Sequence, residues 1–518
     1  MPLLTPHRNS PREPSTAICK AVLGLSALYI VAYVTIACLR MRYPFELEWM
    51  EGGAVDEVRR ILAGQRLYVP PSLDFVPFIY TPLYFYVSAL VARIVGIGFF
   101  PLRLVSFAAS LGCFVVIFQM VRRQTASNFA AGLATGLFAA CYRAAGAWFD
   151  LARVDTLGLF LLLAAIHLLQ LNASLAVCLT AAVLMTAAFQ TKQMALAMLL
   201  PLIAWSVSYH RRLGILLAGA VLALLGGSVM LLSRLSDGWY ELYVFALPGK
   251  QKLLPGVLTA GGAIDFLWRD IIRVLPIASA LAVYFLVVRF RHETRRSFFF
   301  WLATAVGTVG GTWASRAHYG GYDNVLMPAY AVVAVLAAMG AHAALERARS
   351  VPARAMPWVQ FAIYALCVMQ LAGLCYDPRR QVPTARDRRA GERLVAAMRR
   401  IDGDVLMSQH GYLTVLAGKR AHARPMAIDD FNLARDERTK ERLVGELERA
   451  VRERRFGAII EDSIGWPSWL PSDIGTYYSR HSLPLAPNVL WPVTGMRTRP
   501  RLLYLPRRTS ANVTGKPD

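Results

Sequence analysis

The sequence has few cysteines and histidines, and their spacing does not suggest a metal site. Its seven cysteines lie in or beside hydrophobic stretches, and no Cys-x-x-Cys pair or histidine-rich spacing occurs in the 518 residues. A disulfide framework and a zinc site are therefore not indicated. None of the nine histidines has an obvious acidic or nucleophilic neighbourhood, which disfavours a membrane O-acyltransferase that works through an embedded histidine base.

Charged residues are also scarce. Only 17% of the residues are charged and 56% are hydrophobic, with a mean hydropathy of +0.41. This composition is too apolar for a soluble protein. The 33 acidic residues are outnumbered by 56 basic ones. In a soluble domain that excess would suggest a nucleic-acid partner, but here the arginine clusters recur between apolar runs and indicate membrane topology, so we expect no nucleic acid.

Long apolar runs predict a mainly α fold, a polytopic transmembrane helical bundle with about eleven spans. The first run is longer than a signal-peptide core and lacks a cleavage site, so we expect it to remain as an anchor behind a cytoplasmic tail at residues 1–15. The predicted transmembrane domain covers residues 16–376. Its runs lie near residues 16–39, 101–121, 126–142, 156–171, 174–189, 194–209, 213–232, 271–289, 297–314, 325–344 and 358–375.

The run 80–98 is ambiguous, because it contains Pro82 and Arg93. An arginine at the bilayer centre costs about 2.5 to 3.5 kcal/mol. If the run 80–98 does not cross the membrane, every basic cluster between later spans lies on the same side of the membrane as the N-terminal tail. The positive-inside rule requires this arrangement. We therefore interpret the run as an interfacial or re-entrant segment within a large first external loop, residues 40–100. Arginine far exceeds lysine, a composition typical of GC-rich bacteria, so we expect a multi-pass protein of the bacterial inner membrane.

Three carboxylates, Glu46, Glu48 and Glu51, crowd the point where the chain leaves its first span. Acids packed beside a lipid surface raise each other's pKa, and they persist where a proton acceptor or a cation ligand is needed. The alternative is a solvated loop. The following residues 54–64 alternate apolar and charged positions at helical spacing, which predicts an amphipathic helix on the membrane that serves either as a lid or as a substrate guide.

From Asp377 onward the composition becomes charged and soluble. We expect residues 377–507 to form an extracytoplasmic α/β domain and residues 508–518 to be a disordered tail. Apolar residues between Leu433 and Val451 recur at helical spacing, and the run 456–462 then predicts a buried strand. No internal repeat is evident, which weakens a transporter built from duplicated halves.

Under this topology the other external loops are short, and each carries charge beside a span end. They are residues 150–155, 191–193 and 315–324. Asp155 opens a span, where it either favours the helix dipole or serves the reaction. Lys192 taken alone is explained by snorkelling to the interface. The loop that contains His318 and Tyr322 suits either a grip on a hydroxylated or phosphorylated ligand or an aromatic belt. Together, acids and bases from separate loops resemble a polar site.

The chain resembles the GT-C membrane glycosyltransferases, the superfamily that includes protein O-mannosyltransferases and the lipid A aminoarabinose transferase. The resemblance covers most of the membrane region and rests on the order and spacing of several short elements. These are Glu48-Trp-Met-Glu51-Gly52, Arg60-Ile-Leu-Ala-Gly64, Leu67-Tyr68, Tyr80-Thr-Pro-Leu-Tyr84, Ala152-Arg-Val-Asp155, Thr191-Lys-Gln193 and Asp323-Asn324 to Pro328.

The resemblance implies that the first external loop supplies a catalytic carboxylate, either Glu48 or Glu51, and that Asp155 is the second acid. The usual motif pairs an Asp with an adjacent Glu, whereas these acids are three residues apart. On a helix that spacing would place both on one face, where they could share a proton or a divalent cation such as Mg or Mn. No cofactor is otherwise indicated.

The implied reaction transfers a sugar from a polyprenyl-phosphate donor to an extracytoplasmic lipid, glycan or protein acceptor, with inversion. The phosphate leaves as a stable anion, so the chemistry needs a base and fixed cations. The expected substrate-binding residues are Arg153, Lys192, Tyr80, Arg316, His318, Tyr322 and Asn324. The alternative function is a lipid-linked saccharide transporter or flippase, which would place its charges in the middle of spans.

Overall fold

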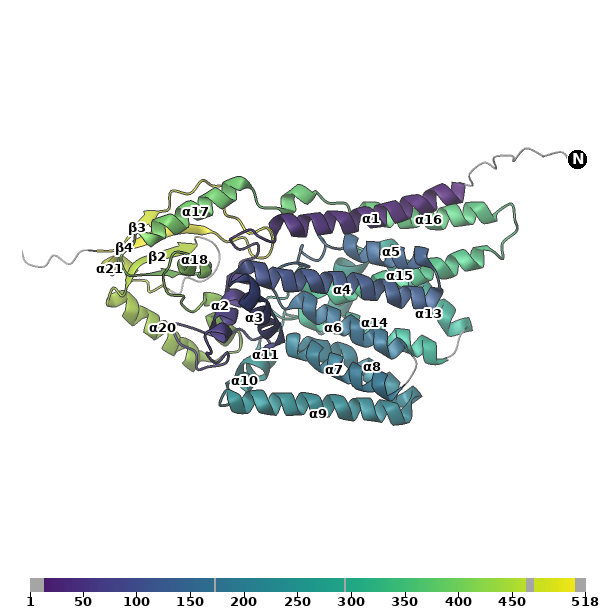
Figure 1. Ribbon diagram of the computed structural model, residues 1–518, viewed down its shortest axis with the longest axis horizontal. Helices are drawn as coiled ribbons and strands as arrows, with labels where there is room; N and C mark the ends of the chain where they lie inside the picture. The colour runs from purple at the N-terminus through teal and green to yellow at the C-terminus, as the bar shows by residue number, and fades with distance from the viewer. Residues whose placement is uncertain (1–13, 172–173, 293–294, 463–469, 508–518) are drawn as a thin grey trace, which may run out of the picture.

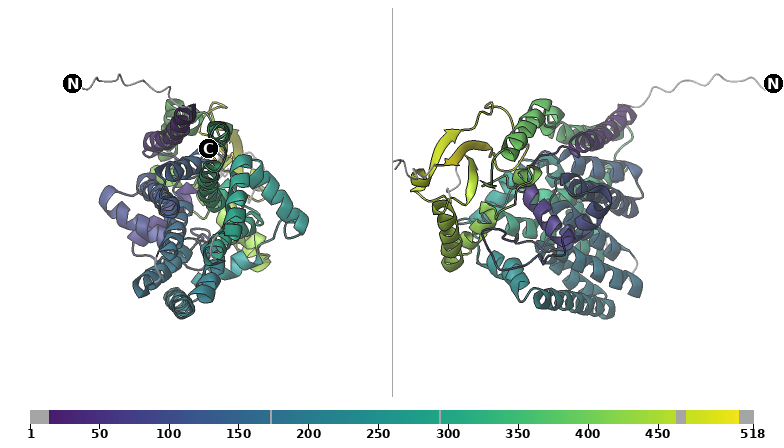
Figure 2. Two further views of the ribbon diagram at one scale, coloured as in Figure 1. Left: turned by 90° about the vertical axis from the view of Figure 1, so that its right-hand side faces the viewer. Right: turned by 60° about the vertical axis from the view of Figure 1, so that its left-hand side comes forward.

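The computed structural model describes residues 14–171, 174–292, 295–462 and 470–507. Figure 1 shows a bundle of long helices lying side by side, with a smaller part that contains the β-strands at one end. The predicted tail 508–518, and all of the predicted tail 1–15 except its last two residues, lie outside the described residues. The right-hand view of Figure 2 shows the same arrangement, with the sheet beyond the end of the bundle.

The bundle contains sixteen α-helices within these described ranges, and each of the eleven apolar runs predicted from the sequence overlaps one of them. They are α1 (Pro14–Arg40), α2 (Glu51–Leu62), α3 (Leu83–Val95), α4 (Phe99–Thr125), α5 (Asn128–Ala140), α6 (Asp155–Gln170), α7 (Leu175–Thr191), α8 (Met194–Tyr209), α9 (Arg211–Leu235), α10 (Trp239–Glu241), α11 (Leu247–Lys250), α12 (Ala260–Phe266), α13 (Pro276–His292), α14 (Arg295–Arg316), α15 (Met327–Ala348) and α16 (Met356–Gly373).

Helix α15 lies at the centre of the bundle and packs against α13, α5 and α14. Nearly all of its residues are buried. Peripheral helices instead expose large apolar side chains, such as Leu28 on α1, Leu222 on α9 and Trp358 on α16, which are 60%, 73% and 72% exposed. So many exposed apolar side chains are stable only against lipid. The protein is therefore an integral membrane protein.

Five described helices are long and apolar enough to cross a membrane: α1, α4, α9, α15 with the short turn before it, and α16. The bent pair formed by α12 with its continuation to Ile272 and α13 would make six. Helices α3, α5, α6, α7 and α8 are apolar but only 13 to 17 residues long. The length criterion thus supports a polytopic fold with fewer certain spans than the eleven predicted.

The C-terminal part is a four-stranded sheet with helices around it. Its strand order is β1-β2-β4-β3, with β1 parallel to β2 and the other pairs antiparallel. The predicted helix and following buried strand are α20 and β2, and the strand has the predicted limits. The elements are α17 (Ala385–Arg399), β1 (Asp404–Met407), α18 (Tyr412–Leu416), α19 (Pro425–Leu433), α20 (Glu437–Arg452), β2 (Phe456–Asp462), α21 (Ile474–Tyr477), β3 (Tyr478–Ser482) and β4 (Pro500–Pro506).

Helix α2 is the amphipathic helix predicted in the first loop, but its charged face is not solvated. Asp56 and Glu57 are only 8% and 2% exposed. The reason is that the C-terminal part covers this face: α18 packs on α2, and Arg424 forms an ion pair with Asp56 (Nη2 to Oδ2, 3.0 Å). The expectation of a helix lying freely on the membrane was therefore wrong on this point.

A fully buried ion pair fixes the end of α1 to the loop after α5. Arg40 donates from Nε and Nη2 to the two carboxylate oxygens of Asp150, both at 2.7 Å. Nη2 also donates to the Ala147 carbonyl, and Nη1 donates to the Gln381 carbonyl. Tyr142 donates a further hydrogen bond to Asp150 at 3.3 Å. This pair connects the first helix, the central loops and the start of the C-terminal part.

Replacing Arg40 with alanine should destabilise the protein strongly, because Asp150 would be left as an unpaired buried charge, at a cost of about 3 to 5 kcal/mol. The matched control is Arg349→Ala, since Arg349 is 67% exposed and its pair with Glu346 contributes at most about 1 kcal/mol. Thermal unfolding of the purified protein in detergent measures both. An Arg40 variant no less stable than the control would contradict this account.

Candidate active site

The acidic loop 41–50 and the first turn of α2 carry the three predicted carboxylates into the protein interior. Glu46, Glu48 and Glu51 are 8%, 1% and 0% exposed, so the solvated-loop alternative does not hold. Glu48 precedes the helix and Glu51 is its first residue. The two acids therefore do not share a helical face, and each has its own cationic partner. This corrects the expectation that they share one proton or one cation.

Glu51 is held by a complete set of hydrogen bonds. Arg103 donates from Nε to Oε1 (2.9 Å) and from Nη2 to Oε2 (2.6 Å). The backbone N–H groups of Leu47 and Ala152 donate to the same oxygens at 2.6 and 2.8 Å. Burial alone would raise the pKa of Glu51, but the charge and hydrogen bonds of Arg103 lower it below its ordinary value. Glu51 is thus a fixed anion without a free lone pair for a substrate proton.

Glu48 has the opposite environment. Its Oε2 accepts a hydrogen bond from the Met50 N–H at 3.1 Å and lies 3.8 Å from Nη1 of Arg153. Its Oε1 is buried and has no hydrogen-bond partner among the described residues. Burial raises the pKa of Glu48 to about 8, against the lowering effect of Arg153. A carboxyl group with an open oxygen and a pKa near neutrality has the properties of a general base.

Arg153 links the acidic loop to the second predicted acid. Its Nη2 donates to the hydroxyl of Tyr80 at 2.8 Å, and its guanidinium lies 5.3 and 6.0 Å from the ring centres of Tyr80 and Trp148. Nε and Nη1 make no hydrogen bond within the described part of the chain. A buried guanidinium with two free N–H directions can bind an anionic oxygen.

Asp155, at the start of α6, collects the predicted loops around itself. Lys192 donates to its Oδ1 at 2.6 Å, Asn324 donates to the same oxygen at 2.8 Å, and the Trp148 indole donates to Oδ2 at 3.1 Å. The loops 150–155 and 191–193 thus bring opposite charges together, whereas the loop 315–324 contributes the neutral amide of Asn324 and not its charged residues. Lys192 is partly exposed, so its ammonium can reach a second partner.

Arg316 and His318 lie apart from this cluster. Arg316 is engaged by Asp270 and Asp323, at 3.3 and 3.6 Å, and by the Gly321 carbonyl. His318 forms a β-bridge with Leu253, and its Nδ1 has no partner in the described ranges. Burial lowers the pKa of His318, which favours its neutral form. Neither contacts Glu48 or Asp155, so a direct substrate role for them has less support than for Tyr80 or Asn324.

Sequence reasoning missed two parts of the site. The first is Arg103, and a signal existed, because an arginine inside the apolar run 101–121 requires a buried acid as partner. The second is the segment 493–495, which no local pattern indicates. The N–H groups of Val493 and Thr494 donate to the Leu47 carbonyl at 2.8 and 3.2 Å. A β-carbon at Gly495 would lie 2.9 Å from Cγ of Glu48, so this strand-like segment covers the acid.

A histidine in an acidic environment was also missed. His410 lies between Glu46, which contacts its Nδ1, and Asp462, whose Oδ2 is 3.2 Å from Nε2. Burial would lower the pKa of His410, but the two carboxylates raise it to about 10. Arg424 binds the other oxygen of Glu46 at 3.3 Å. This cluster ties the first loop to the C-terminal part, and the statement that none of the histidines has acidic neighbours was wrong for His410.

The residues around Glu51 and Asp155 do not fit a divalent cation, so Glu51 cannot share one with Glu48. Both oxygens of Glu51 are taken by Arg103 and backbone N–H groups, and those of Asp155 by Lys192, Asn324 and Trp148. A cation needs several free oxygens, whereas these face hydrogen-bond donors. No group of three or more His, Cys, Asp or Glu side chains suited to a metal occurs in the described ranges. We derive no step through a metal.

No family model and no curated protein sequence matches the chain. Solved structures do match. ArnT from Cupriavidus metallidurans bound to undecaprenyl phosphate has a TM-score of 0.56 and 13% identity, over 94% of this chain and 98% of ArnT. The archaeal oligosaccharyltransferase AglB from Archaeoglobus fulgidus, in complex with an inhibitory peptide and a dolichol-phosphate, has a TM-score of 0.53 and 12% identity, over 85% of this chain and 69% of AglB. Both neighbours are GT-C membrane glycosyltransferases, so the resemblance seen in the sequence is confirmed for the fold.

The two acids of the first loop should differ in their effect on stability. Glu51→Gln should destabilise the protein by about 3 to 5 kcal/mol, because Arg103 would lose its counter-charge in the interior. Glu48→Gln should not. The folded-state pKa of Glu48, about 8, is raised, so the unfolded chain loses this proton first and stability falls as the pH rises toward 8. Glutamine carries no such penalty.

Thermal unfolding in detergent at pH 5 and at pH 9 measures both effects. At pH 5 we expect the Glu48→Gln variant and the unmodified protein to unfold at similar temperatures. At pH 9 the variant should be at least as stable as the unmodified protein. The Glu51→Gln variant should unfold at lower temperature at both values. Equal losses in the two variants would refute the distinction between a free and a fixed carboxylate.

Proposed function

We propose that the protein is an integral membrane glycosyltransferase that transfers a sugar from a polyprenyl-phosphate donor to an extracytoplasmic acceptor. The observation that carries this proposal is the open Oε1 of Glu48, buried beside the unsatisfied Nε and Nη1 of Arg153. An acid able to take a proton next to a cation able to hold an anion is what this displacement requires. The GT-C fold supports the same reaction class.

In the proposed mechanism, Glu48 removes the proton from the acceptor hydroxyl or amine as that atom bonds to the anomeric carbon. The bond from the anomeric carbon to the phosphate oxygen breaks, and its electron pair leaves with the polyprenyl phosphate. A single displacement of this kind inverts the anomeric centre. Arg153 and Lys192 stabilise the departing phosphate, and Asp155 orients Lys192. Tyr80, Tyr322 and Asn324 bind the substrates around this centre.

Glu48 is a better candidate for the catalytic base than Glu51 because it has a free lone pair. A base must face the substrate with an unoccupied oxygen, and Glu51 has none. The acids and bases of the site gather at one end of the helices and not in the middle of spans. This arrangement gives no specific support to the alternative, a lipid-linked saccharide transporter.

We further propose eleven crossings of a bacterial inner membrane, made by α1, α4 to α9 and α13 to α16. The charged loops then face outward with an extracytoplasmic α/β domain at residues 377–507, whereas the turns α4–α5, α8–α9 and α15–α16 face the cytoplasm. The helix ends beside those three turns carry basic residues such as Arg122, Arg211 and Arg347, as the positive-inside rule requires. Helix α3, with Leu90 and Ile94 exposed, would lie in the outer interface.

Glu48→Gln should abolish sugar transfer, because glutamine accepts no proton, while the protein keeps its fold. Transfer by the unmodified enzyme should rise with pH and level off above about 8, since only the ionised form of Glu48 acts as a base. Membranes incubated with labelled polyprenyl-phosphate sugars over a range of pH values measure both. Full transfer by the Glu48→Gln variant would reject Glu48 as the base.

Arg153→Gln offers a second readout in the same assay. The charge of Arg153 lowers the pKa of Glu48, so its removal should move the rise in activity to higher pH and reduce the rate. Arg349→Gln, at an exposed position, is the control that should leave the profile unchanged. A profile for Arg153→Gln with an unshifted midpoint would separate Arg153 from the base.

The proposed orientation is tested by a reporter fused in frame after residue 377. A periplasmic alkaline phosphatase should be active there, and the same enzyme fused after residue 350, between α15 and α16, should be inactive. The two fusions differ by a single proposed crossing. An active fusion after residue 350 together with an inactive fusion after residue 377 would show that the orientation is the reverse of the proposed one.

A further inference from the structure

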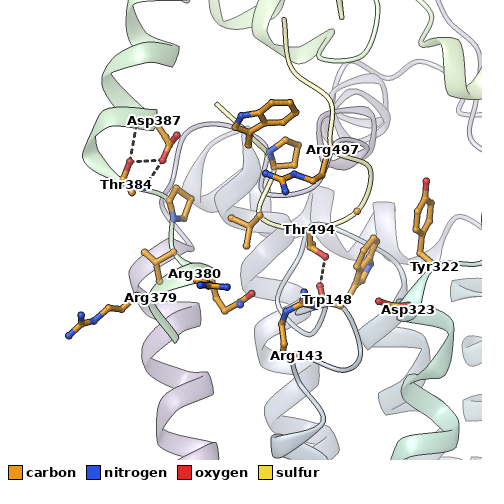
Figure 3. A pocket seen from close by; sticks show the side chains of 18 of the residues that line it. Arg143, Trp148, Tyr322, Asp323, Arg379, Arg380, Thr384, Asp387, Thr494 and Arg497 are labelled. Carbon is orange, nitrogen blue, oxygen red and sulfur yellow. Dashed lines mark hydrogen bonds between the residues drawn. The ribbon is translucent and has the colours of Figure 1, made fainter. Parts of the chain in front are cut away.

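A cavity of about 720 Å³ lies between the end of the bundle and the C-terminal part. Its lining comes from four separate segments, the turn after α5, the loop before α15, the residues that lead into α17, and the segment before β4 (Figure 3). Arg143, Arg380 and Arg497 each come from a different one of these segments and direct their side chains to the common space. A fourth arginine, Arg379, lines the edge and points outward in Figure 3.

The acids of the lining do not neutralise these arginines. Asp387 accepts hydrogen bonds from the N–H and hydroxyl of Thr384, at 2.8 and 2.6 Å, and from the N–H of Leu490 at 2.9 Å. Asp323 forms an ion pair with Arg316, which does not line the cavity, at 3.6 Å. Within the described part of the chain, Arg143 has no ion-pair partner. The cavity therefore presents an excess of positive charge to whatever enters it.

Arg380 and Arg497 are held more weakly than the arginine of a buried ion pair would be. Arg380 lies 3.7 Å from Asp377, and both side chains are largely exposed, so this contact contributes little. Arg497 stacks on the ring of Trp491 at 5.2 Å, which positions its guanidinium without using its N–H donors on an acid. Guanidinium groups held in this way can bind phosphate or carboxylate oxygens with two parallel hydrogen bonds.

Aromatic side chains complete the lining. Trp148, Trp491 and Tyr322 all border the cavity. A large aromatic ring with a polar edge suits the face of a sugar ring, which carries C–H groups on one side and hydroxyls around it. Arginines together with aromatic rings therefore favour an anionic saccharide over a peptide backbone or a bare lipid chain.

The inner wall of this cavity touches both acids of the candidate active site. Trp148 donates its indole N–H to Asp155 at 3.1 Å. Gly495 packs directly on Glu48, where an added β-carbon would lie 2.9 Å from Cγ. Thr494, between cavity and bundle, donates to the Gly146 carbonyl at 2.5 Å. An occupant of the cavity is thus one residue away from the proposed base.

We propose that this cavity is the acceptor subsite and that it takes a saccharide bearing a phosphate or carboxylate group. The proposal rests on the glycosyltransferase function above and names its acceptor class. Arg143, Arg380 and Arg497 bind the anionic group, and the aromatic rings hold the sugar beside Gly495, which lines the cavity and packs on Glu48. The polyprenyl-phosphate donor binds separately, at Arg153 and Lys192.

Binding without turnover tests the subsite. Titration of the purified full-length protein with hexose 6-phosphate, followed by tryptophan fluorescence, should show saturable binding that the neutral hexose does not match. Arg380→Gln and Arg497→Gln should each weaken the binding of the hexose phosphate by about tenfold. Arg379→Gln is the matched control, because the side chain of Arg379 points out of the cavity, and it should change the affinity less than twofold.

The outcomes separate this proposal from the proposed function. Glu48→Gln should retain hexose phosphate binding while losing transfer, and the two arginine variants should raise the acceptor KM with little change in kcat. Equal binding of the neutral hexose, no saturable binding, or unchanged affinity in Arg380→Gln and Arg497→Gln would overturn the subsite. Displacement of the hexose phosphate by polyprenyl phosphate would also overturn it, since the cavity would then hold the donor.

A final comparison identifies the source of the anionic sugar. The same phosphorylated sugar carried on a lipid in detergent micelles should bind more tightly than the free sugar phosphate if the acceptor is a membrane glycolipid. Equal affinities would assign the subsite to a water-soluble acceptor. Either result presupposes that the cavity recognises the anionic saccharide, and weaker binding of both than of the neutral hexose would reject it.

Discussion

A charge in a water-poor interior must have a counter-charge, and this requirement organises the external end of the bundle. Glu51 and Arg103 neutralise each other, as do Arg40 and Asp150, and further hydrogen bonds complete each pair. Because each pair joins segments that are far apart in the sequence, the pairs fix how the first loop lies on the helices. That fixed frame holds Glu48 against Arg153 with one oxygen unpaired. The reactive character of one acid thus depends on the complete neutralisation of its neighbour.

The C-terminal part forms a wall of the same region. Backbone N–H groups of Val493 and Thr494 bond to the Leu47 carbonyl, and the buried cluster around His410 and Arg424 grips Glu46. The acidic loop is therefore enclosed between bundle and sheet, and water is excluded from it. Exclusion of water strengthens the interaction of Arg153 with any anion that replaces the solvent. The candidate site requires both parts of the chain.

The sequence was sufficient for the features that local patterns determine. Apolar runs with basic flanks indicated the helices, and helical spacing followed by a short apolar run indicated α20 and β2. Alternation of the spans brought Asp155, Lys192 and Asn324 to one end, and they are in contact. The burial of Asp56 and the pairing of His410 with Glu46 depend on contacts between residues more than 300 positions apart. No local periodicity encodes which surface will cover another, so these features needed the structure.

Several polar atoms of the candidate site are buried without a hydrogen-bond partner among the described residues. They are Glu48 Oε1, Arg153 Nε and Nη1, and Asn324 Oδ1. Each such atom costs about 1 to 3 kcal/mol if nothing binds it. Arg153 faces Glu48, while Asn324 and Trp148 both donate to Asp155. Donors and acceptors that are held in place and left open are suited to a polar substrate, because the protein has already met the cost of ordering them.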